Sequence, residues 1–319
     1  MMKNKRGMDI ILEKITGKIL HIIGSLFNTI VFLFTNKKRV LVVNGWMELY
    51  GGKPLHQNLG DELNYYLLKE LSNQKIVNYR NLYIKCVNYC CIGSIIDTLA
   101  ENNTIIWGAG LITDKDTLNN VPLKICAVRG ALTRNKLLEE GVQCPEVYGD
   151  PALLLPLIYD GHSVSKNKRV KKKIVGLIPH IVDLNNVNVR RFINNEGVKI
   201  IRLCGYKHWH DIIDEINQCD FIISSSLHGV IISDAYNIPN VWVEFSNNVV
   251  GNGFKFRDYY SSVRKNIPEP VKILNSTSLE ELLEYEKCWE PINIDLNKLL
   301  QACPFEIKEK FINKGDGIK

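Results

Sequence analysis

The fold is indicated most clearly by residues 221–236, FIISSSLHGVIISDAY. Phe221 to Ser224 have the composition of a short buried strand, and Val230 to Tyr236 have the apolar pattern of a helix. Hydroxyl-bearing residues and His228 lie between them. A strand that passes into a helix through a small polar turn is typical of a parallel sheet covered by helices. We therefore predict an α/β fold, and we expect chemistry near His228, because ligands bind beyond the carboxyl ends of such strands.

The same alternation extends in both directions from this stretch. Strands are predicted at Val40 to Asn44, Thr104 to Trp107, Lys124 to Val128, Ile174 to Ile178, Val198 to Leu203 and Val241 to Phe245. Helices are predicted at Asp61 to Leu71, Ala131 to Glu140 and Asp211 to Gln218. The pattern occurs in both halves of a chain of 319 residues, and a domain usually has about 150. Two Rossmann-like domains that face a cleft are therefore the predicted architecture.

The boundaries between these domains follow from charge. Residues 166–173 hold six lysines or arginines and have no apolar periodicity, which indicates a solvated linker that could also touch anionic lipid. We place the domains at 37–165 and 174–275, with an amphipathic segment at 1–36 before them and a helical tail at 276–319 after them. Ile19 to Asn36 are uncharged, with polar and apolar residues on opposite helical faces. This helix is expected either to lie in a membrane interface or to pack its apolar face on the first domain.

Composition excludes several classes of protein. The chain is 45% hydrophobic and 23% charged, as in folded globular proteins. Its net charge of +6 is not concentrated in a basic stripe with aromatic residues, so we expect no nucleic-acid partner. The nine cysteines are odd in number and contain no C-x-x-C pair, which favours a reducing cytoplasm and no metal site.

His228 is the sharpest candidate for chemistry. The start of a helix offers free backbone N–H groups and a positive dipole end, which favour a phosphate or carboxylate beside an imidazole that can move protons. Ser225, Ser226 and Gly229 flank this histidine. The alternative is a capping serine and a packed histidine.

Other candidates also follow predicted strands or open predicted helices. Asn58 and Asp61 open a helix in the first half, where Asp61 can cap it. Arg129 follows a strand and can grip an anion or form a surface salt bridge. Asp150, in a Gly-Asp-Pro turn, can hold a sugar hydroxyl or cap the next segment. Further candidates are His180 at a strand end, and Lys255 and Arg257, which follow a glycine-rich stretch and suggest a mobile basic lid.

Six of these motifs, in this order, resemble those of the polysaccharide pyruvyltransferase family. They are Asn58-Leu59-Gly60-Asp61, Ala127-Val128-Arg129-Gly130, Gly149-Asp150-Pro151, Ile178-Pro179-His180, Ser226-Leu227-His228-Gly229 and Phe254-Lys255-Phe256-Arg257-Asp258. The resemblance spans about residues 40 to 264 and is nearest to the ketal-pyruvate transferases of bacterial exopolysaccharide synthesis. It implies a fold like that of the two-domain GT-B glycosyltransferases.

The resemblance also implies a reaction. Phosphoenolpyruvate is the implied donor, a sugar hydroxyl pair accepts pyruvate as a cyclic ketal, and no metal or other cofactor is required. His228 is the implied acid and base, and Asp61 is the second implied catalytic residue. Asp61, Asp150 or Glu244 could orient the acceptor hydroxyls, and the sequence does not rank them. Many members carry arginine where this chain has Ser226, so Arg129, Lys255 or Arg257 must supply positive charge to the donor. The implied donor-binding residues are Arg129, Ser225, Ser226, Gly229, Lys255 and Arg257, and the implied acceptor-binding residues are Asn58, Asp150, His180 and Glu244.

The implied acceptor is a lipid-linked oligosaccharide or polysaccharide at the inner face of the cytoplasmic membrane, within reach of residues 1–36. Two other functions fit the same residues. One is a nucleotide-sugar glycosyltransferase of the GT-B fold, because paired Rossmann domains with a basic cleft serve both chemistries. The other is a non-catalytic, membrane-associated scaffold with a vestigial cleft.

Overall fold

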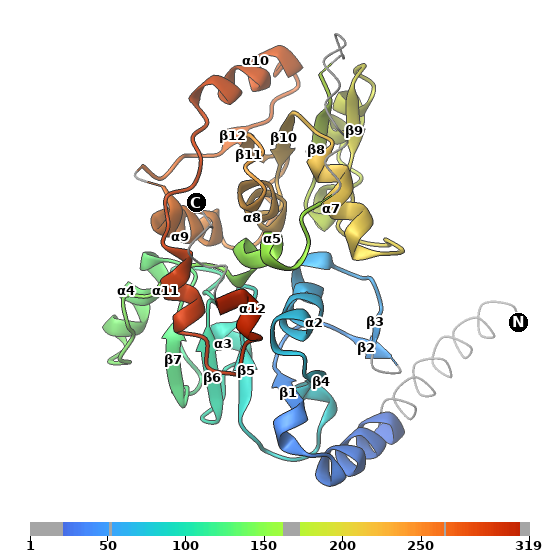
Figure 1. The fold of residues 1–319 in the computed structure, drawn as a ribbon. Coiled ribbons are helices and arrows are strands. Elements are labelled where there is room, and N and C mark those ends of the chain that lie inside the picture. The colour runs from blue at the N-terminus through green and yellow to red at the C-terminus, as the bar shows by residue number, and fades with distance from the viewer. Residues whose placement is uncertain (1–21, 51–52, 162–172, 265, 313–319) are drawn as a thin grey trace, which may run out of the picture.

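The structure, a computed structural model, describes residues 22–50, 53–161, 173–264 and 266–312. Two five-stranded sheets form its two halves, and every strand pair within them is parallel. Figure 1 shows the sheets one above the other, each with its own helices. The predicted α/β class with two Rossmann-like domains is confirmed.

The first half carries the sheet β4-β1-β5-β6-β7. Its strands are β1 (Val40–Val43), β4 (Lys75–Asn78), β5 (Asn88–Cys90), β6 (Thr104–Trp107) and β7 (Lys124–Ala127). Its helices are α2 (Leu59–Ser72), α3 (Ile96–Leu99), α4 (Ala131–Glu139) and α5 (Leu155–Ile158), with 3-10 turns η1 (Lys37–Arg39), η2 (Tyr79–Asn81) and η3 (Pro151–Leu154). A separate hairpin is formed by β2 (Leu49–Tyr50) and β3 (Lys53–Pro54).

The second half carries the sheet β12-β11-β10-β8-β9. Its strands are β8 (Val175–Ile178), β9 (Val198–Ile200), β10 (Phe221–Ser224), β11 (Asn240–Glu244) and β12 (Val271–Lys272). Its helices are α6 (Val187–Ile193), α7 (Trp209–Asn217), α8 (Leu227–Ala235), α9 (Phe254–Val263) and α10 (Leu279–Leu283), with turns η4 (Ile181–Asp183) and η5 (Glu284–Cys288). The helices α11 (Leu296–Gln301) and α12 (Glu309–Ile312) follow.

Each half has the same strand order. When the strands of a sheet are numbered along the chain, both sheets read 2-1-3-4-5. The direction in which the sheet is built changes beside its first strand, between β1 and β5 in one half and between β8 and β10 in the other. Ligands bind at such switch points in doubly wound folds, outside the carboxyl ends of the strands.

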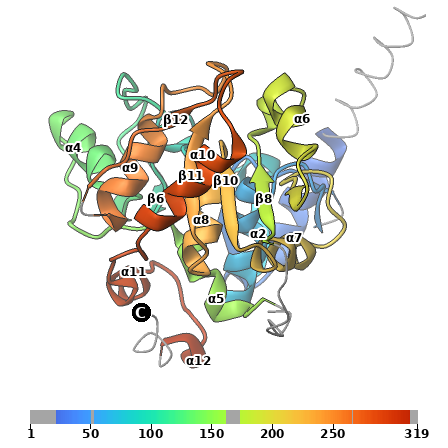
Figure 2. The ribbon, with the colours of Figure 1, turned by 90° about the horizontal axis from the view of Figure 1, so that it is seen from above.

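Two segments from the C-terminal part of the chain pack on the first half. Helix α9 packs beside α4, as Figure 2 shows, and Phe254 joins the apolar core around β6. The indole Nε1 of Trp107 donates a hydrogen bond to the carbonyl oxygen of Leu299, at 2.8 Å, and the ring of Phe305 packs edge-on against that indole. Residues 276–312, predicted as a tail, therefore contribute to both halves: α10 stays with the second, and α11 packs on the first.

Some predicted segments lie partly outside the described residues. Of the linker at 166–173, only Lys173 is described, and it forms an ion pair with Glu286. Of the segment at 1–36, residues 22–34 form a helix. Across the described parts of the chain, no helix is both long and apolar enough to cross a membrane.

Candidate functional site

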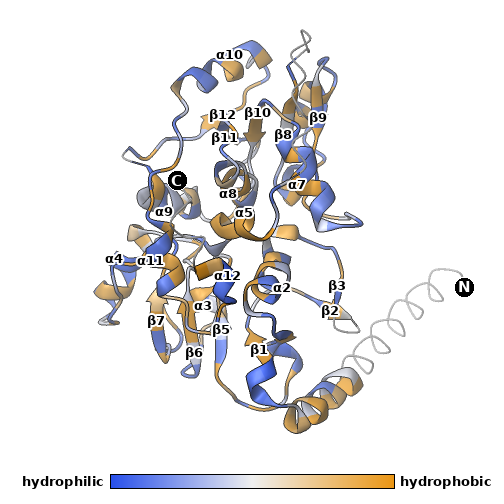
Figure 3. Cartoon of the chain, viewed as in Figure 1, coloured by the Kyte–Doolittle hydropathy of each residue, from blue (hydrophilic) through white to orange (hydrophobic). Residues whose placement is uncertain are grey.

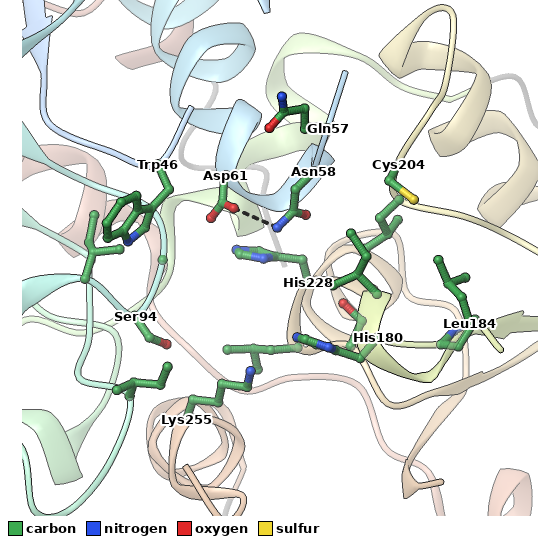
Figure 4. A pocket seen from close by; sticks show the side chains of 18 residues that line it. Trp46, Gln57, Asn58, Asp61, Ser94, His180, Leu184, Cys204, His228 and Lys255 are labelled. Atoms are coloured by element: carbon green, nitrogen blue, oxygen red, sulfur yellow. Dashed lines mark hydrogen bonds between the residues drawn. The ribbon is translucent and has the colours of Figure 1, made fainter. Parts of the chain in front are cut away.

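A cavity of about 210 Å³ lies where the switch points of the two sheets meet. Trp46 and Ser94 line it from the segments after β1 and β5, and His180 and His228 line it from the segments after β8 and β10. Lys255 reaches it from α9. Figure 4 shows these side chains around one space, with His228 beside Asp61. The cavity thus lies where the strand order predicts a ligand.

His228 lies in the first turn of α8, which begins three residues before the predicted helix, with Ser226 at the N-cap position. The imidazole packs against the backbone of Gly60 in α2, where an added Cβ would lie 2.0 Å from Nδ1. Only glycine permits this approach between the halves. On the other side of the ring, Nε2 is buried and has no hydrogen-bond partner among the described residues. A buried polar atom of this kind is expected to be satisfied by a ligand or water.

Burial keeps this imidazole neutral, helped by nearby positive charges. Together, burial and the charges of Arg129 and Lys255 lower the pKa of His228 to about 3. Near neutral pH, His228 can therefore accept a proton or hydrogen bond at Nε2. An anion in the cavity would raise its pKa, because it opposes these nearby cations.

Asp61 is held at the start of α2. Asn58 caps this helix: its Oδ1 accepts a hydrogen bond from Gly60 N at 3.2 Å, and its Nδ2 donates one to Asp61 Oδ2 at 2.7 Å. Leu59 N donates to the carbonyl oxygen of Leu203 in the second half, at 2.7 Å, which fixes the helix start across the cleft. Burial raises the pKa of Asp61 to about 6. This carboxyl group can therefore exchange a proton near neutral pH.

Lys255 supplies a positive charge in the cavity. Its side chain is buried in α9, and burial lowers its pKa to about 8, with Arg129 acting in the same direction and Asp61 opposing. It is therefore largely protonated at neutral pH. Burial also lowers the pKa of His180 to about 4, again with a contribution from Lys255. Among the cavity's described lining residues, Lys255 is therefore the side chain suited to hold an anion.

Of the three predicted donor-binding residues that flank His228, only one lines the cavity. Ser226 lines the cavity. The Ser225 hydroxyl accepts a hydrogen bond from His180 N and donates one to Asp183 Oδ2, both at 2.9 Å, so it positions the turn that carries His180. Gly229 packs tightly, since an added Cβ would lie 2.4 Å from Ser224 Oγ. Close packing, not contact with the cavity, explains that glycine.

Arg129 does not line the cavity. Its guanidinium is fully buried, and Nε donates to Asp258 Oδ2 at 2.9 Å. Its other nitrogens donate to Ser94 Oγ and to the carbonyl oxygen of Leu111. The sequence predicted that Arg129 grips an anion or forms a surface salt bridge, whereas the structure shows a buried ion pair behind Ser94. Arg129 therefore acts on the cavity through its charge and through its hydrogen bond to Ser94, which lines the cavity.

Three further candidates also lie outside this cavity. Asp150 is buried and caps η3, since its Oδ1 accepts from Ala152 N at 2.9 Å; burial raises its pKa to about 7. Glu244 lines a second cavity of about 260 Å³, beside the loop at 246–253. Arg257 donates to the carbonyl oxygen of Asn252 at 2.6 Å. The predicted mobile lid is wrong, because Lys255 and its neighbours form the buried helix α9 and pack between the halves.

Comparison with known proteins identifies the family of this chain. A family model described as polysaccharide pyruvyl transferase matches residues 58–247, more than half of the chain. The chain belongs to this family. The resemblance noted in the sequence is therefore confirmed, and the function of the protein is pyruvyl transfer in polysaccharide biosynthesis.

Two relatives show how far the similarity extends. The succinoglycan biosynthesis protein ExoV of Rhizobium meliloti (strain 1021) is 27% identical over 255 residues, which cover 76% of this chain and 73% of that protein. An uncharacterized protein of Acanthamoeba polyphaga mimivirus is 28% identical over 214 residues, which cover 64% of this chain and 70% of that protein. No solved structure matches.

The cavity of this pyruvyl transferase includes residues that sequence reasoning missed. Trp46 is 45% exposed, and the guanidinium of Arg80 lies 4.1 Å from its ring centroid. Gln57, Ser94 and Cys204 also line the cavity. Trp46 could have been found, because it follows the strand predicted at Val40 to Asn44. The described residues contain no cluster of three or more side chains suited to bind a metal ion.

Proposed function

We propose that this pyruvyl transferase uses phosphoenolpyruvate as donor and attaches pyruvate to two hydroxyls of a saccharide as a cyclic ketal. The observation that carries the proposal is the unpartnered Nε2 of His228, which lies in one cavity with Asp61 and Lys255. These groups supply a proton carrier, a second acid or base and an anion contact. We also propose a GT-B-like fold, because two Rossmann-like halves meet at this cavity and the C-terminal part of the chain returns to the first half.

The donor is a small trianionic molecule, and the cavity offers it two sources of positive potential. Lys255 can pair with the phosphate or the carboxylate. Helix α8 begins at the cavity, so its positive dipole end faces the same space. Ser226 stands at the start of that helix, where many members carry arginine. Lys255 compensates for the missing arginine, because it is the one lysine or arginine among the described residues that line the cavity.

The first chemical step adds an acceptor hydroxyl to C2 of phosphoenolpyruvate. The new C–O bond forms as Asp61 takes the hydroxyl proton and His228 delivers a proton to C3, which becomes a methyl group. His228 is neutral in the empty cavity, and the negative charge of the bound donor raises its pKa so that it can carry this proton. Both groups then return to their starting states by exchanging protons with each other or with water.

The second step breaks the C2–O bond to phosphate. The oxocarbenium-like centre at C2 is captured by the second hydroxyl, and the proton of that hydroxyl leaves with inorganic phosphate. The products are a cyclic ketal and one phosphate, so the reaction neither oxidises nor reduces the substrate. Lys255 stabilises the negative charge that develops on the departing phosphate.

The acceptor enters from the rim of the cavity. Trp46 presents a half-exposed aromatic face there, and Gln57 and Asn58 add polar groups suited to sugar hydroxyls. We propose a lipid-linked oligosaccharide or polysaccharide at the inner face of the cytoplasmic membrane as acceptor. The name of ExoV, a succinoglycan biosynthesis protein, supports a saccharide.

The decisive experiment is thermal stabilisation by phosphoenolpyruvate, compared with a panel of uridine and guanosine diphosphate sugars. A ligand that binds only the folded state raises the melting temperature of the protein. Lys255→Met is expected to weaken phosphoenolpyruvate binding about tenfold or more, because a charge-assisted contact is lost. Arg257→Met is the matched control, since this side chain lies on the same helix but outside the cavity. Stabilisation by nucleotide sugars alone would make the protein a glycosyltransferase and overturn the proposal.

A further inference from the structure

The helix at residues 22–34 is attached to the first half by its more polar face. Ser25, Thr29 and Phe32 are buried there. The Thr29 hydroxyl accepts a hydrogen bond from Tyr83 N at 3.0 Å, and Phe32 packs in a cluster with Val40. The sequence left open whether the apolar face packs on the first domain. For residues 22–34 it does not.

The opposite face of this helix is apolar and open to solvent. We call it the outer face; its side chains are between 48% and 88% exposed and follow helical spacing: Ile22, Ile23, Leu26, Phe27, Ile30, Leu33 and Phe34. Figure 3 shows this helix at the edge of the first half with hydrophobic residues along its surface. A surface helix usually turns its apolar stripe toward the core and its polar residues toward water. This helix does the reverse, and an apolar surface of this extent indicates a partner.

The charge around the outer face identifies the partner. Lys37, Lys38 and Arg39 form the turn η1, which is separated from the end of the helix by two residues, and all three are exposed. No aspartate or glutamate occurs between residues 22 and 39. An apolar face next to a purely cationic cluster is complementary to a bilayer with anionic head groups. A second copy of the chain fits less well, because it would bring the same cationic cluster to the contact.

We propose that the outer face binds an anionic membrane surface, with the helix in the plane of the interface and Lys37, Lys38 and Arg39 among the lipid phosphates. The hydrogen bond to Thr29 and the packing of Phe32 hold the helix rigidly, so its side chains are already presented before the membrane is met. This inference does not depend on which donor or acceptor the cavity binds.

The test is co-sedimentation of the full chain with vesicles of phosphatidylglycerol and phosphatidylcholine in equal parts, and with vesicles of phosphatidylcholine alone. The variant Ile23→Gln/Leu26→Gln/Ile30→Gln is expected to partition about a hundredfold less to both kinds of vesicle. Val121→Gln/Leu123→Gln is the matched control, because these side chains are 62% and 56% exposed but lie elsewhere, and it should bind like the wild type. Unchanged melting temperatures would show that the variants are folded.

A charge variant distinguishes electrostatic attraction to anionic lipid from non-specific hydrophobic adsorption. Lys37→Gln/Lys38→Gln/Arg39→Gln should weaken binding to the anionic vesicles by about a hundredfold and change binding to neutral vesicles little. The proposal is overturned if the wild type binds neither vesicle, or if the outer-face variant binds as well as the wild type. It is also overturned if sedimentation velocity without lipid shows a dimer that the outer-face variant converts to a monomer.

Discussion

The buried ion pair between Arg129 and Asp258 joins the two halves, and we predict that Asp258→Ala destabilises the protein strongly. Both side chains are wholly inaccessible to solvent. The Asp258 carboxylate accepts from Arg129 Nε at 2.9 Å, from Thr133 N at 2.7 Å and from Thr133 Oγ1 at 2.8 Å. The substitution therefore leaves a buried cation and a buried N–H group without their acceptor.

The magnitude follows from these losses. Removing one partner of a buried ion pair costs about 3–5 kcal/mol of the free energy of unfolding. We count the cost of leaving the Thr133 N–H unpaired within this range, because both losses come from the same carboxylate. For 319 residues, an unfolding entropy of about 2.1 cal/mol/K per residue gives roughly 0.7 kcal/mol/K. The melting temperature should then fall by about 4–7 °C.

Calorimetry of three variants tests this reasoning. Arg129→Met/Asp258→Leu should cost less than Asp258→Ala alone, because neither charge is left unpaired. Glu139→Ala, which breaks an exposed pair with Lys136, is the control and should shift the melting temperature by about 1 °C or less. A shift below 1 °C for Asp258→Ala, or a double variant less stable than the single, would refute the structural role assigned to the pair.

Three further predictions concern the cavity. Gly60→Ala should weaken phosphoenolpyruvate binding tenfold or more, because the new Cβ would displace the His228 ring, whereas Gly24→Ala, which meets nothing within 4 Å, should not; binding is measured by ligand-induced thermal stabilisation. Asp61→Asn should raise the melting temperature at pH 8 but not at pH 4. The pKa of Asp61 is raised to about 6 in the folded protein, so the ionised carboxylate opposes folding increasingly as the pH rises from about 4 to 6. At pH 8 the substitution should increase the free energy of unfolding by about 1–3 kcal/mol. Trp46→Ala should raise the KM for the saccharide about tenfold and leave phosphoenolpyruvate stabilisation unchanged, and equal losses for both substrates would contradict its place at the rim.

Two central strands were predicted from the sequence with both ends correct. Phe221 to Ser224 and Thr104 to Trp107 match β10 and β6 at both ends, because a central parallel strand appears as a continuous apolar run. The edge strand β4 (Lys75–Asn78) was missed, since its polar ends give it no such run. Helix α9 was also missed. Its Lys255 and Asp258 look like surface residues and are buried only because α9 packs on the first half.

The candidate site could be predicted where the position of a residue along a strand or helix is enough. His228 and Asp61 lie at the starts of helices beside the cleft, and the structure brings them into one cavity. For Arg129, position along the chain was not enough to predict its role. Its place after a strand indicates the cleft, but its partner Asp258 lies 129 residues further along the chain, and no local pattern reveals such a pairing.

The cavity depends on the fit between the two halves more than on either half alone. His228 lies at the start of a helix of the second half and Asp61 at the start of one of the first, so neither half carries both of the proposed proton-transfer groups. Their relative position is fixed by contacts that cross the cleft: Leu59 N to the Leu203 carbonyl oxygen, and Arg129 to Asp258. The imidazole packs on the backbone of Gly60 with no room for a methyl group, so even a small shift between the halves would move Nε2 relative to Asp61. Proton transfer requires hydrogen-bonding distances. The buried contacts between the halves are therefore a condition for the proposed chemistry as well as a source of stability.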